Sequence, residues 1–367
     1  MDTFGFIIHP IDPKRDISRK FPLLAKLVNE RQIYRYAPYF PPVYISEITG
    51  IRSAFSGKEI KGWFVACPLT PAHVLQLPEK RVYRKIIDTG RLAERLGAKI
   101  LGLGAYTSVA GDGGVTIAKA MDVPVTTGDS YTVSVALQAL YKAAEVMDIQ
   151  LEHASAAVVG ATGTIGRVCA ELLAENVARL HLIGRKIETL ERLRDEIVAA
   201  KRSAVDLRVS TDMSVLKESD LIVTVTSSME SVIEPEHLRA GSVVCDVARP
   251  RDVSAKIAST RDDVLVIDGG MVDVPGLVDF HFDFGFPPGK AYACMAETIA
   301  LALEGRFEDY SLGKQISRAR VEEITAIAEK HGFRLSGFRS FERAVTDEMI
   351  DRVRQKARPT HIEFIGK

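Results

Sequence analysis

The sequence predicts an α/β protein with a Rossmann-like doubly wound parallel sheet, joined to an N-terminal α/β domain. Three observations predict this class. A glycine-rich turn separates a strand pattern from a helix pattern, strands and helices alternate after it, and 367 residues suggest about two domains. We expect an N-terminal substrate and catalytic domain over 1–150, a nucleotide-binding domain over 151–275, and a C-terminal helical region over 276–367 that returns to the first domain.

The glycine-rich turn follows the apolar run 156–159. Glycines at such a junction let backbone N–H groups approach a pyrophosphate at the positive end of a helix. The spacing is G-x-x-G-x-x-G, a relative of the usual dinucleotide motif, and its strand–turn–helix setting favours a dinucleotide site over a purely structural turn. The residues expected to contact the cofactor are Gly160, Ala161, Thr162, Gly163, Thr164, Ile165 and Gly166.

The expected strand 180–184 is followed by Arg185 and Lys186 rather than by an acidic residue. An acidic residue at this position holds the ribose 2′-hydroxyl of NAD, whereas an arginine suits a 2′-phosphate. We therefore predict NADPH as the cofactor, and the alternative is a pair of solvated loop cations. Thr226 and Ser227, at the end of another expected strand, are further candidate cofactor contacts.

The remaining hydrophobic patterns fill in both domains. Short apolar runs predict buried strands, and apolar residues at three- and four-residue spacing predict helices. The other expected strands are 4–8, 63–66, 99–104, 221–226, 242–246 and 264–268, and the expected helices include 74–96, a helix capped by Asp129 and Ser130, 187–200, and a segment that starts near 291.

Composition excludes several classes of protein. Lys plus Arg and Asp plus Glu number 48 each, so no net field attracts nucleic acid. No apolar run approaches the ~18 residues that span a bilayer, and the N-terminus lacks a signal-peptide layout. We therefore expect a cytoplasmic protein without a transmembrane segment. The eight histidines show no ligand-like pair, so we expect no metal site.

Cys294 is the candidate nucleophile. It follows the breaker cluster 287–290 and lies within the first two turns of an expected helix. A helix N-terminus stabilises a thiolate and lowers the pKa of the thiol. The alternative is a small buried hydrophobic residue, which is the role that we expect for Cys169 and Cys245. Cys67 is a second candidate, because it ends an expected strand.

The chain resembles the fatty-aldehyde-forming long-chain acyl-(acyl-carrier-protein) reductase family from about residue 4 to residue 333. The resemblance implies that the glycine-rich turn binds NADPH and that Cys294 accepts the acyl group. It implies an NADPH-dependent enzyme that reduces a fatty acyl thioester, of acyl carrier protein or CoA, to a fatty aldehyde through a cysteine acyl-enzyme. The segments that carry the resemblance are 4–9, 103–108, 126–128, 160–166, 269–270, 292–297, 303–305 and 330–333.

The segment 271–290 departs from the family pattern and places phenylalanines at the alternate positions 280, 282, 284 and 286. In an extended conformation these rings would share one face. They would either wall an acyl-chain tunnel or fill a core, and both remain open. Turn residues are a second group of substrate candidates, although turn and cap roles are equally open for them. The substrate candidates are Tyr106, Thr107, Ser108, Thr127, Phe282 and Phe284.

An acyl carrier protein is usually acidic, so we expect a basic docking surface. The densest basic cluster is Lys80, Arg81, Arg84 and Lys85, for which a solvated helix face is the alternative. An enzyme that consumes the aldehyde would be a further partner. Two other functions stay open. A shikimate-type NADP-dependent alcohol dehydrogenase would need a lysine–aspartate pair, with Lys85 and Asp88 the nearest candidates, and a regulator would bind NADPH without turnover.

Overall fold

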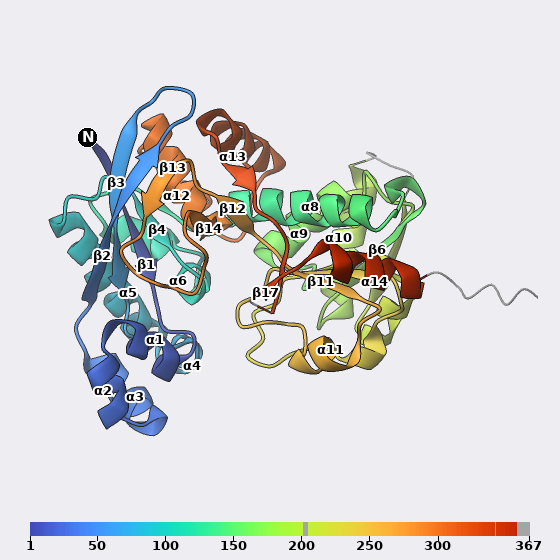
Figure 1. Ribbon diagram of the computed structural model, residues 1–367, viewed down its shortest axis with the longest axis horizontal. Helices are drawn as coiled ribbons and strands as arrows, with labels where there is room; N and C mark the ends of the chain where they lie inside the picture. The colour runs from blue at the N-terminus through green and yellow to red at the C-terminus, as the bar shows by residue number, and fades with distance from the viewer. Residues whose placement is uncertain (201–204, 342, 358–367) are drawn as a thin grey trace, which may run out of the picture. The chain divides into compact units, whose positions relative to one another are not determined.

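The computed structural model describes residues 1–200, 205–341 and 343–357 (Figure 1). It has the predicted Rossmann-like α/β class, with parallel strands and connecting helices. Residues 358–367, at the end of the expected C-terminal region 276–367, lie outside the described part. Within that part, no helix is both long enough and apolar enough to cross a bilayer.

Two compact units make up the chain, and each combines two separate stretches of sequence. The expected C-terminal region 276–367 does not form a unit of its own. Its first two helices belong to the unit that contains the N-terminus, and its last helix belongs to the other unit. Unit 1 consists of Met1–Val135 and Gly270–Ser336, and unit 2 consists of Ala136–Gly269 and Gly337–Lys367.

Unit 2 contains a six-stranded parallel sheet in the order β11-β10-β9-β6-β7-β8. The chain leaves the central strand β6 towards β7 and β8 and later returns on the other side of β6 through β9. This reversal creates a topological switch point between β6 and β9, where such sheets bind ligands. The strands are β6 (Ser155–Val159), β7 (Arg179–Ile183), β8 (Asp206–Ser210), β9 (Leu221–Thr224), β10 (Val243–Asp246) and β11 (Leu265–Asp268).

Amphipathic helices connect these strands. In α10, Leu190, Leu193 and Ile197 recur at helical spacing and are buried, while the opposite face is charged. The short strands β16 (Arg339–Ser340) and β17 (Arg343–Ala344) form a two-stranded ladder near the C-terminus. The helices wholly within unit 2 are α9 (Thr164–Leu173), α10 (Ile187–Ala199), α11 (Ala255–Thr260) and α14 (Asp347–Ala357), with single 3₁₀ turns at Leu151–His153, Met213–Glu218 and Pro235–His237.

Unit 1 is built on a mixed sheet in the order β13-β2-β3-β1-β4-β5. Strands β3, β1, β4 and β5 run parallel to one another, and β2 and β13 extend the sheet in antiparallel fashion. The carboxyl ends of the parallel strands therefore meet at one edge. The strands are β1 (Asp2–Ile8), β2 (Val43–Arg52), β3 (Glu59–Ala66), β4 (Leu101–Leu103), β5 (Val125–Thr126) and β13 (Gly276–Asp279), and a small antiparallel sheet contains β12 (Met271–Asp273), β14 (Lys290–Tyr292) and β15 (Arg334–Leu335).

The helices of unit 1 surround this sheet, and α8 (Asp129–Val146) begins in unit 1 and ends in unit 2. Proline ends the first helical stretch after β3, because α4 stops at Gln76 and Pro78 precedes α5. The remaining helices are α1 (Pro13–Lys20), α2 (Pro22–Leu27), α3 (Glu30–Tyr36), α4 (Pro71–Gln76), α5 (Glu79–Arg95), α6 (Tyr106–Val109), α7 (Val115–Ala120), α12 (Ala293–Glu304) and α13 (Arg318–His331), with a 3₁₀ turn at Ala37–Tyr39.

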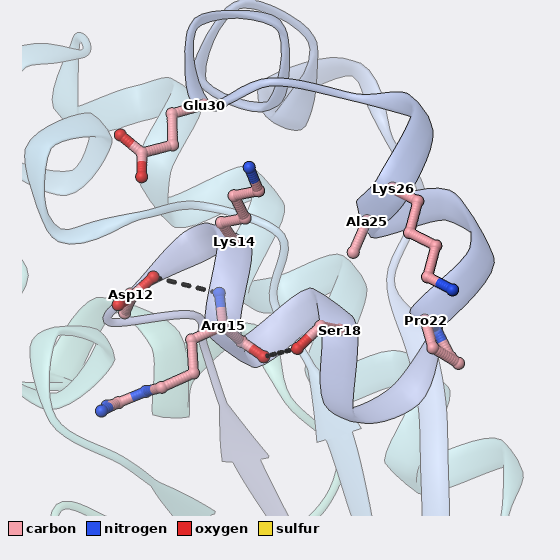
Figure 2. Close-up of a pocket in the computed structure, with 8 residues that line it drawn as sticks. All are labelled: Asp12, Lys14, Arg15, Ser18, Pro22, Ala25, Lys26 and Glu30. Atoms are coloured by element: carbon pink, nitrogen blue, oxygen red, sulfur yellow. Dashed lines mark hydrogen bonds between the residues drawn. The ribbon is translucent and has the colours of Figure 1, made fainter.

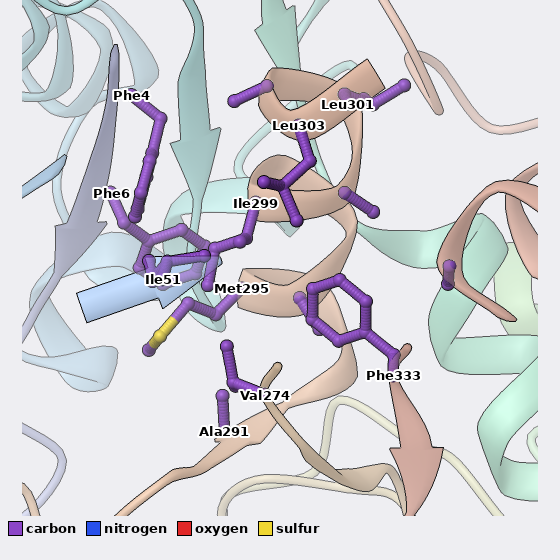
Figure 3. Close-up of a cluster of buried hydrophobic side chains, with 14 of the residues drawn as sticks. Phe4, Phe6, Ile51, Val274, Ala291, Met295, Ile299, Leu301, Leu303 and Phe333 are labelled. Atoms are coloured by element: carbon purple, nitrogen blue, oxygen red, sulfur yellow. The ribbon is translucent and has the colours of Figure 1, made fainter. Parts of the chain in front are cut away.

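Helix α12 lies at the centre of the unit 1 core (Figure 3). It is apolar on nearly every side, as a fully buried helix must be. Met295 and Ile299 point towards the strand that carries Phe6, and Phe333 packs from another side. Tyr292, which falls within the helical segment expected to start near 291, instead ends β14 and precedes the first turn of α12.

The phenylalanine segment is not extended. Residues 280–289 contain bends and turns, because His281 (φ +47°) and Gly285 (φ +96°) adopt left-handed backbone angles. Strand periodicity therefore does not determine where the four rings point. Phe280 and Phe284 contact each other with ring centroids 5.0 Å apart, and both contact Phe64.

Candidate active site

The glycine-rich turn lies at the switch point of the unit 2 sheet. Gly160 follows β6 with φ +83°, and a Cβ there would lie 2.7 Å from the carbonyl oxygen of Val225, the residue after β9. A Cβ on Gly166 would collide with the Gly160 carbonyl, so this glycine permits close packing of α9 on the turn. Gly163 precedes α9, which has no side-chain cap among the described residues. Uncapped N–H groups at a helix start suit the pyrophosphate of a dinucleotide.

The other predicted cofactor residues occupy neighbouring strand ends of unit 2. Arg185 and Lys186 follow β7 and are exposed, which suits contact with a phosphate on the ribose. Ser227 is also exposed, two residues beyond Val225. The Thr226 hydroxyl already donates a hydrogen bond to the Asp252 carboxylate within the protein. Strand β9 ends at Thr224, two residues before the end of the expected strand 221–226.

Cys294 is the second residue of α12, close to the predicted position. All four cysteines are free, and Cys294 is partly exposed whereas Cys67, Cys169 and Cys245 are buried. Burial raises the pKa of the Cys67 thiol to about 11 and that of Cys169 to about 12. Exposure therefore favours Cys294 as the cysteine that a substrate can reach.

Gly128 lets the start of α8 approach Cys294. A Cβ on Gly128 would collide with the Cα and Cβ atoms of Cys294, and its φ of +78° is a left-handed angle that glycine adopts without strain. The N-termini of α8 and α12 therefore lie against each other within unit 1. Each helix start carries a partial positive charge, which suits a developing oxyanion.

Glu297 connects the starts of α8 and α12 through hydrogen bonds. It is fully buried on α12, one turn beyond Cys294. Its carboxylate accepts hydrogen bonds from the Thr126 hydroxyl and from the Tyr131 backbone N–H, the latter at 2.8 Å. Because glycine precedes α8 and has no side chain, Glu297 supplies the missing N-terminal cap from another helix.

The pKa of the Cys294 thiol is raised to about 12, and the predicted lowering is wrong. Burial is the largest cause, and the negative charges of Asp129 and Glu297 add to it. Burial and the charge of Glu297 likewise raise the pKa of Asp129 to about 8. Burial and the two acidic neighbours therefore outweigh the helix N-terminus, and the resting sulfur is a thiol.

The turn residues predicted to contact substrate lie at the carboxyl edge of the unit 1 sheet and are buried. The Thr107 hydroxyl donates to the Gly104 carbonyl at 2.7 Å, and the Ser108 hydroxyl donates to the Ala105 carbonyl at 2.6 Å. These are the bonds of a turn. The backbone N–H of Tyr106 donates to Nε2 of His9 at 3.0 Å, and burial lowers the pKa of that histidine to about 4.

The aromatic segment reaches the start of α12. Phe284 contacts Phe286 with centroids 5.2 Å apart, and Phe286 contacts Tyr292 at 4.3 Å. Phe282 and Phe284 are partly buried against the unit 1 core. The rings thus form core packing that ends two residues before Cys294, and the tunnel remains a prediction.

Asp129 and Glu297 are the residues that sequence reasoning missed. Asp129 was assigned only a cap role, and Glu297 was no more than part of a matching segment. One signal was present, since Glu297 is the single charged residue in the apolar run 293–303. A single charged side chain on a buried helix needs hydrogen-bond or charge partners, so its presence in the sequence indicates a polar site within the core.

A separate cavity of about 580 Å³ lies among the short helices α1, α2 and α3 (Figure 2). Figure 2 shows the Arg15 backbone N–H donating to Asp12 and the Ser18 hydroxyl donating to the Arg15 carbonyl. No predicted site residue lines this cavity. Its lining residues are Asp12, Lys14, Arg15, Ser18, Pro22, Ala25, Lys26 and Glu30.

Two comparisons relate the chain to known oxidoreductases. Residues 141–268 match the family model described as shikimate / quinate 5-dehydrogenase. The chain is 29% identical over 347 residues to long-chain acyl-(acyl-carrier-protein) reductase from Synechococcus elongatus, covering 90% of this chain and 98% of that protein. It is thus a distant relative of oxidoreductases with an NAD(P)-type nucleotide domain.

A second relative is the aminotransferase PigE from a Serratia species, 34% identical over 364 residues. This match covers 96% of the chain but only 41% of PigE, so the chain spans about two fifths of that protein's length. Among solved structures, quinate dehydrogenase from Corynebacterium glutamicum in complex with NAD is similar at 12% identity, covering 90% of this chain and 98% of that one, with a TM-score of 0.38.

Proposed function

We propose that the chain reduces a fatty acyl thioester, carried by acyl carrier protein or CoA, to a fatty aldehyde with NADPH. The observation that carries this proposal is the partly exposed Cys294 at the joined N-termini of α8 and α12. A nucleophilic thiol beside oriented backbone dipoles is what acyl transfer requires. The 29% identical reductase supports the same reaction class.

The chain's residues would act in two stages. The Cys294 sulfur attacks the thioester carbonyl carbon, the bond to the carrier sulfur breaks, and the acyl group stays on Cys294. The helix starts at Gly128 and Ala293 stabilise the negative oxygen. The glycine-rich turn, Arg185 and Lys186 would hold NADPH, which would supply the hydride needed to convert the bound acyl group into an aldehyde.

Replacement of Cys294 by serine tests the covalent route. Wild-type protein incubated with palmitoyl-CoA should gain one acyl group, and addition of NADPH should release the aldehyde. The variant Cys294→Ser should show neither, while its affinity for NADPH stays unchanged. Intact-protein mass spectrometry and product analysis read the two outcomes, and Cys67→Ser, which replaces a buried cysteine, is the matched control. A Cys294→Ser variant that forms aldehyde at the wild-type rate excludes the proposal.

The shikimate-type dehydrogenase remains a second candidate because the family model matches residues 141–268. The lysine–aspartate pair considered for it lies on α5, where Lys85 donates to the Phe40 carbonyl at 2.8 Å and Asp88 is exposed. Thiol alkylation separates the candidates. Inactivation that palmitoyl-CoA prevents supports the reductase, whereas alcohol oxidation that survives alkylation supports the dehydrogenase. NADPH binding without either reaction indicates the regulator.

A further inference from the structure

Three acidic groups share one small buried region of unit 1. Cys294 and Glu297 project from the first two turns of α12, and Asp129 is the first residue of α8. Gly128 contacts Cys294, and Asp129 is the next residue along the chain. The three groups interact electrostatically, because the charge of Asp129 raises the pKa of Cys294 and the charge of Glu297 raises the pKa of Asp129.

The two carboxyl groups have different surroundings. Burial raises the pKa of Glu297, and the Thr126 hydroxyl and the Tyr131 N–H, which both donate to it, oppose that rise by favouring its ionised form. Burial and the charge of Glu297 raise the pKa of Asp129 to about 8, whereas the Thr127 hydroxyl lowers it. At neutral pH the Asp129 carboxyl therefore carries the proton most of the time and is ionised for the rest.

The different protonation of the two carboxyl groups follows from electrostatics. Two buried carboxyls that interact do not both ionise at neutral pH, and the proton stays on the one with fewer donors. The titratable groups that face Asp129 are Cys294 and Glu297 from α12, and Tyr310 faces Glu297 from the segment after that helix. A thiol held neutral beside this pair needs a nearby group that takes its proton.

We infer that the Asp129 carboxyl is the acid–base partner of Cys294, held in place by Glu297 as a positioning residue. The inference rests on the proposed function. As the Cys294 sulfur bonds to the acyl carbon, its proton passes to the ionised form of Asp129. As the carbon–sulfur bond to the carrier breaks, Asp129 returns that proton to the leaving sulfur, so the carrier departs as a neutral thiol and Asp129 is regenerated.

The test compares two reactions of the same thiol. Acyl transfer from palmitoyl-CoA needs the Cys294 proton removed and a proton for the leaving sulfur, whereas alkylation by iodoacetamide releases iodide and needs only the first of these steps. In Asp129→Asn, acylation at pH 7 should fall about 100-fold, within the ~10²–10⁴ range of general acid–base catalysis. Alkylation should fall by a smaller factor, because iodide leaves without a proton. Asp129→Glu should restore part of the acylation rate, and Asp122→Asn, at an exposed aspartate, is the control.

A positioning role for Glu297 has its own readout. Glu297→Gln removes the charge that raises the pKa of Asp129, so the inflection near pH 8 in the acylation profile should move to lower pH. An unmoved inflection overturns the role of Glu297. Equal acylation rates in wild type and Asp129→Asn, or a parallel loss of acylation and alkylation, overturn the role of Asp129. Wild-type protein that palmitoyl-CoA never acylates instead removes the proposed function itself.

Discussion

Gly128 is the residue on which the position of Cys294 depends most directly. Its left-handed backbone and the missing side chain both serve the contact between α8 and α12. In Gly128→Ala, the left-handed angle costs about 1–2 kcal/mol and the collision with Cys294 adds to it. We expect the free energy of unfolding, measured by urea denaturation, to fall by more than about 2 kcal/mol.

Gly289 offers a matched control for this substitution. Its φ of +74° resembles that of Gly128, but a Cβ added to Gly289 would meet no atom within 4 Å. Gly289→Ala should therefore lose only the backbone contribution of about 1–2 kcal/mol. Equal losses in the two variants would show that crowding at Cys294 is unimportant.

Only some of the individual residues of the candidate site could be predicted from the sequence. Cys294 could be chosen because breakers and a helix pattern are local features of the sequence. The role of Glu297 could not, since its partners Thr126 and Tyr131 are 171 and 166 positions away. The direction of the Cys294 pKa shift was missed for the same reason, because Asp129 approaches the thiol through tertiary structure alone.

Among the elements, the β6–α9 turn was predicted most fully, because its glycines and its strand and helix neighbours are contiguous. The phenylalanine segment was predicted poorly. Period-two spacing implies an extended chain, but the left-handed angle at His281, a residue with a side chain, cannot be read from that spacing. Pairing of the unit 1 strands likewise depends on contacts between distant segments.

The element between β7 and α10 should determine the choice between NADPH and NADH. A charge-assisted hydrogen bond contributes about 1.5–3 kcal/mol, so Arg185→Glu should weaken NADPH binding at least tenfold. NADH has no 2′-phosphate, and its affinity should change little. Fluorescence titration with both nucleotides measures the effect.

Arg192, exposed on the neighbouring helix α10, provides the control for charge reversal. Arg192→Glu should leave both affinities within about twofold of wild type, because screening weakens charges that do not contact the ligand. Equal weakening of NADPH and NADH by Arg185→Glu would contradict recognition of the 2′-phosphate.

For the whole molecule, the discontinuous units explain why the expected linear domains differ from the compact ones. Sequence patterns identify helices and strands but do not show which of the two units each one packs into. Helix α14 completes unit 2, where Ile350 and Val353 are buried and Arg354 pairs with Asp148. A stretch at the end of the chain therefore contributes to the stability of the nucleotide unit.

Val353→Asp should destabilise unit 2, because burial of an unpaired carboxylate costs about 2–5 kcal/mol. We expect a lower unfolding temperature and weaker NADPH binding, measured by thermal denaturation and fluorescence titration. The same substitution at the exposed Arg352 should have little effect. Similar melting temperatures for the two variants would show that α14 contributes little.

The basic cluster on α5 belongs to the exterior of unit 1, where Lys80, Arg81 and Arg84 are exposed. If an acidic carrier protein docks there, the double variant Arg81→Glu and Arg84→Glu should raise the KM for palmitoyl-acyl carrier protein about tenfold. The KM for an uncharged N-acetylcysteamine thioester should not change. Lys119→Glu, at another exposed lysine of the unit, is the control, and equal effects on both substrates would argue against docking.

The firmly held proton on Cys294 also has a consequence for chemical durability. Peroxides and stray electrophiles attack thiolates, so a sulfur that stays protonated at neutral pH resists conversion to sulfenic acid. We therefore expect the resting protein to keep this sulfur reduced for longer than it would keep a thiolate.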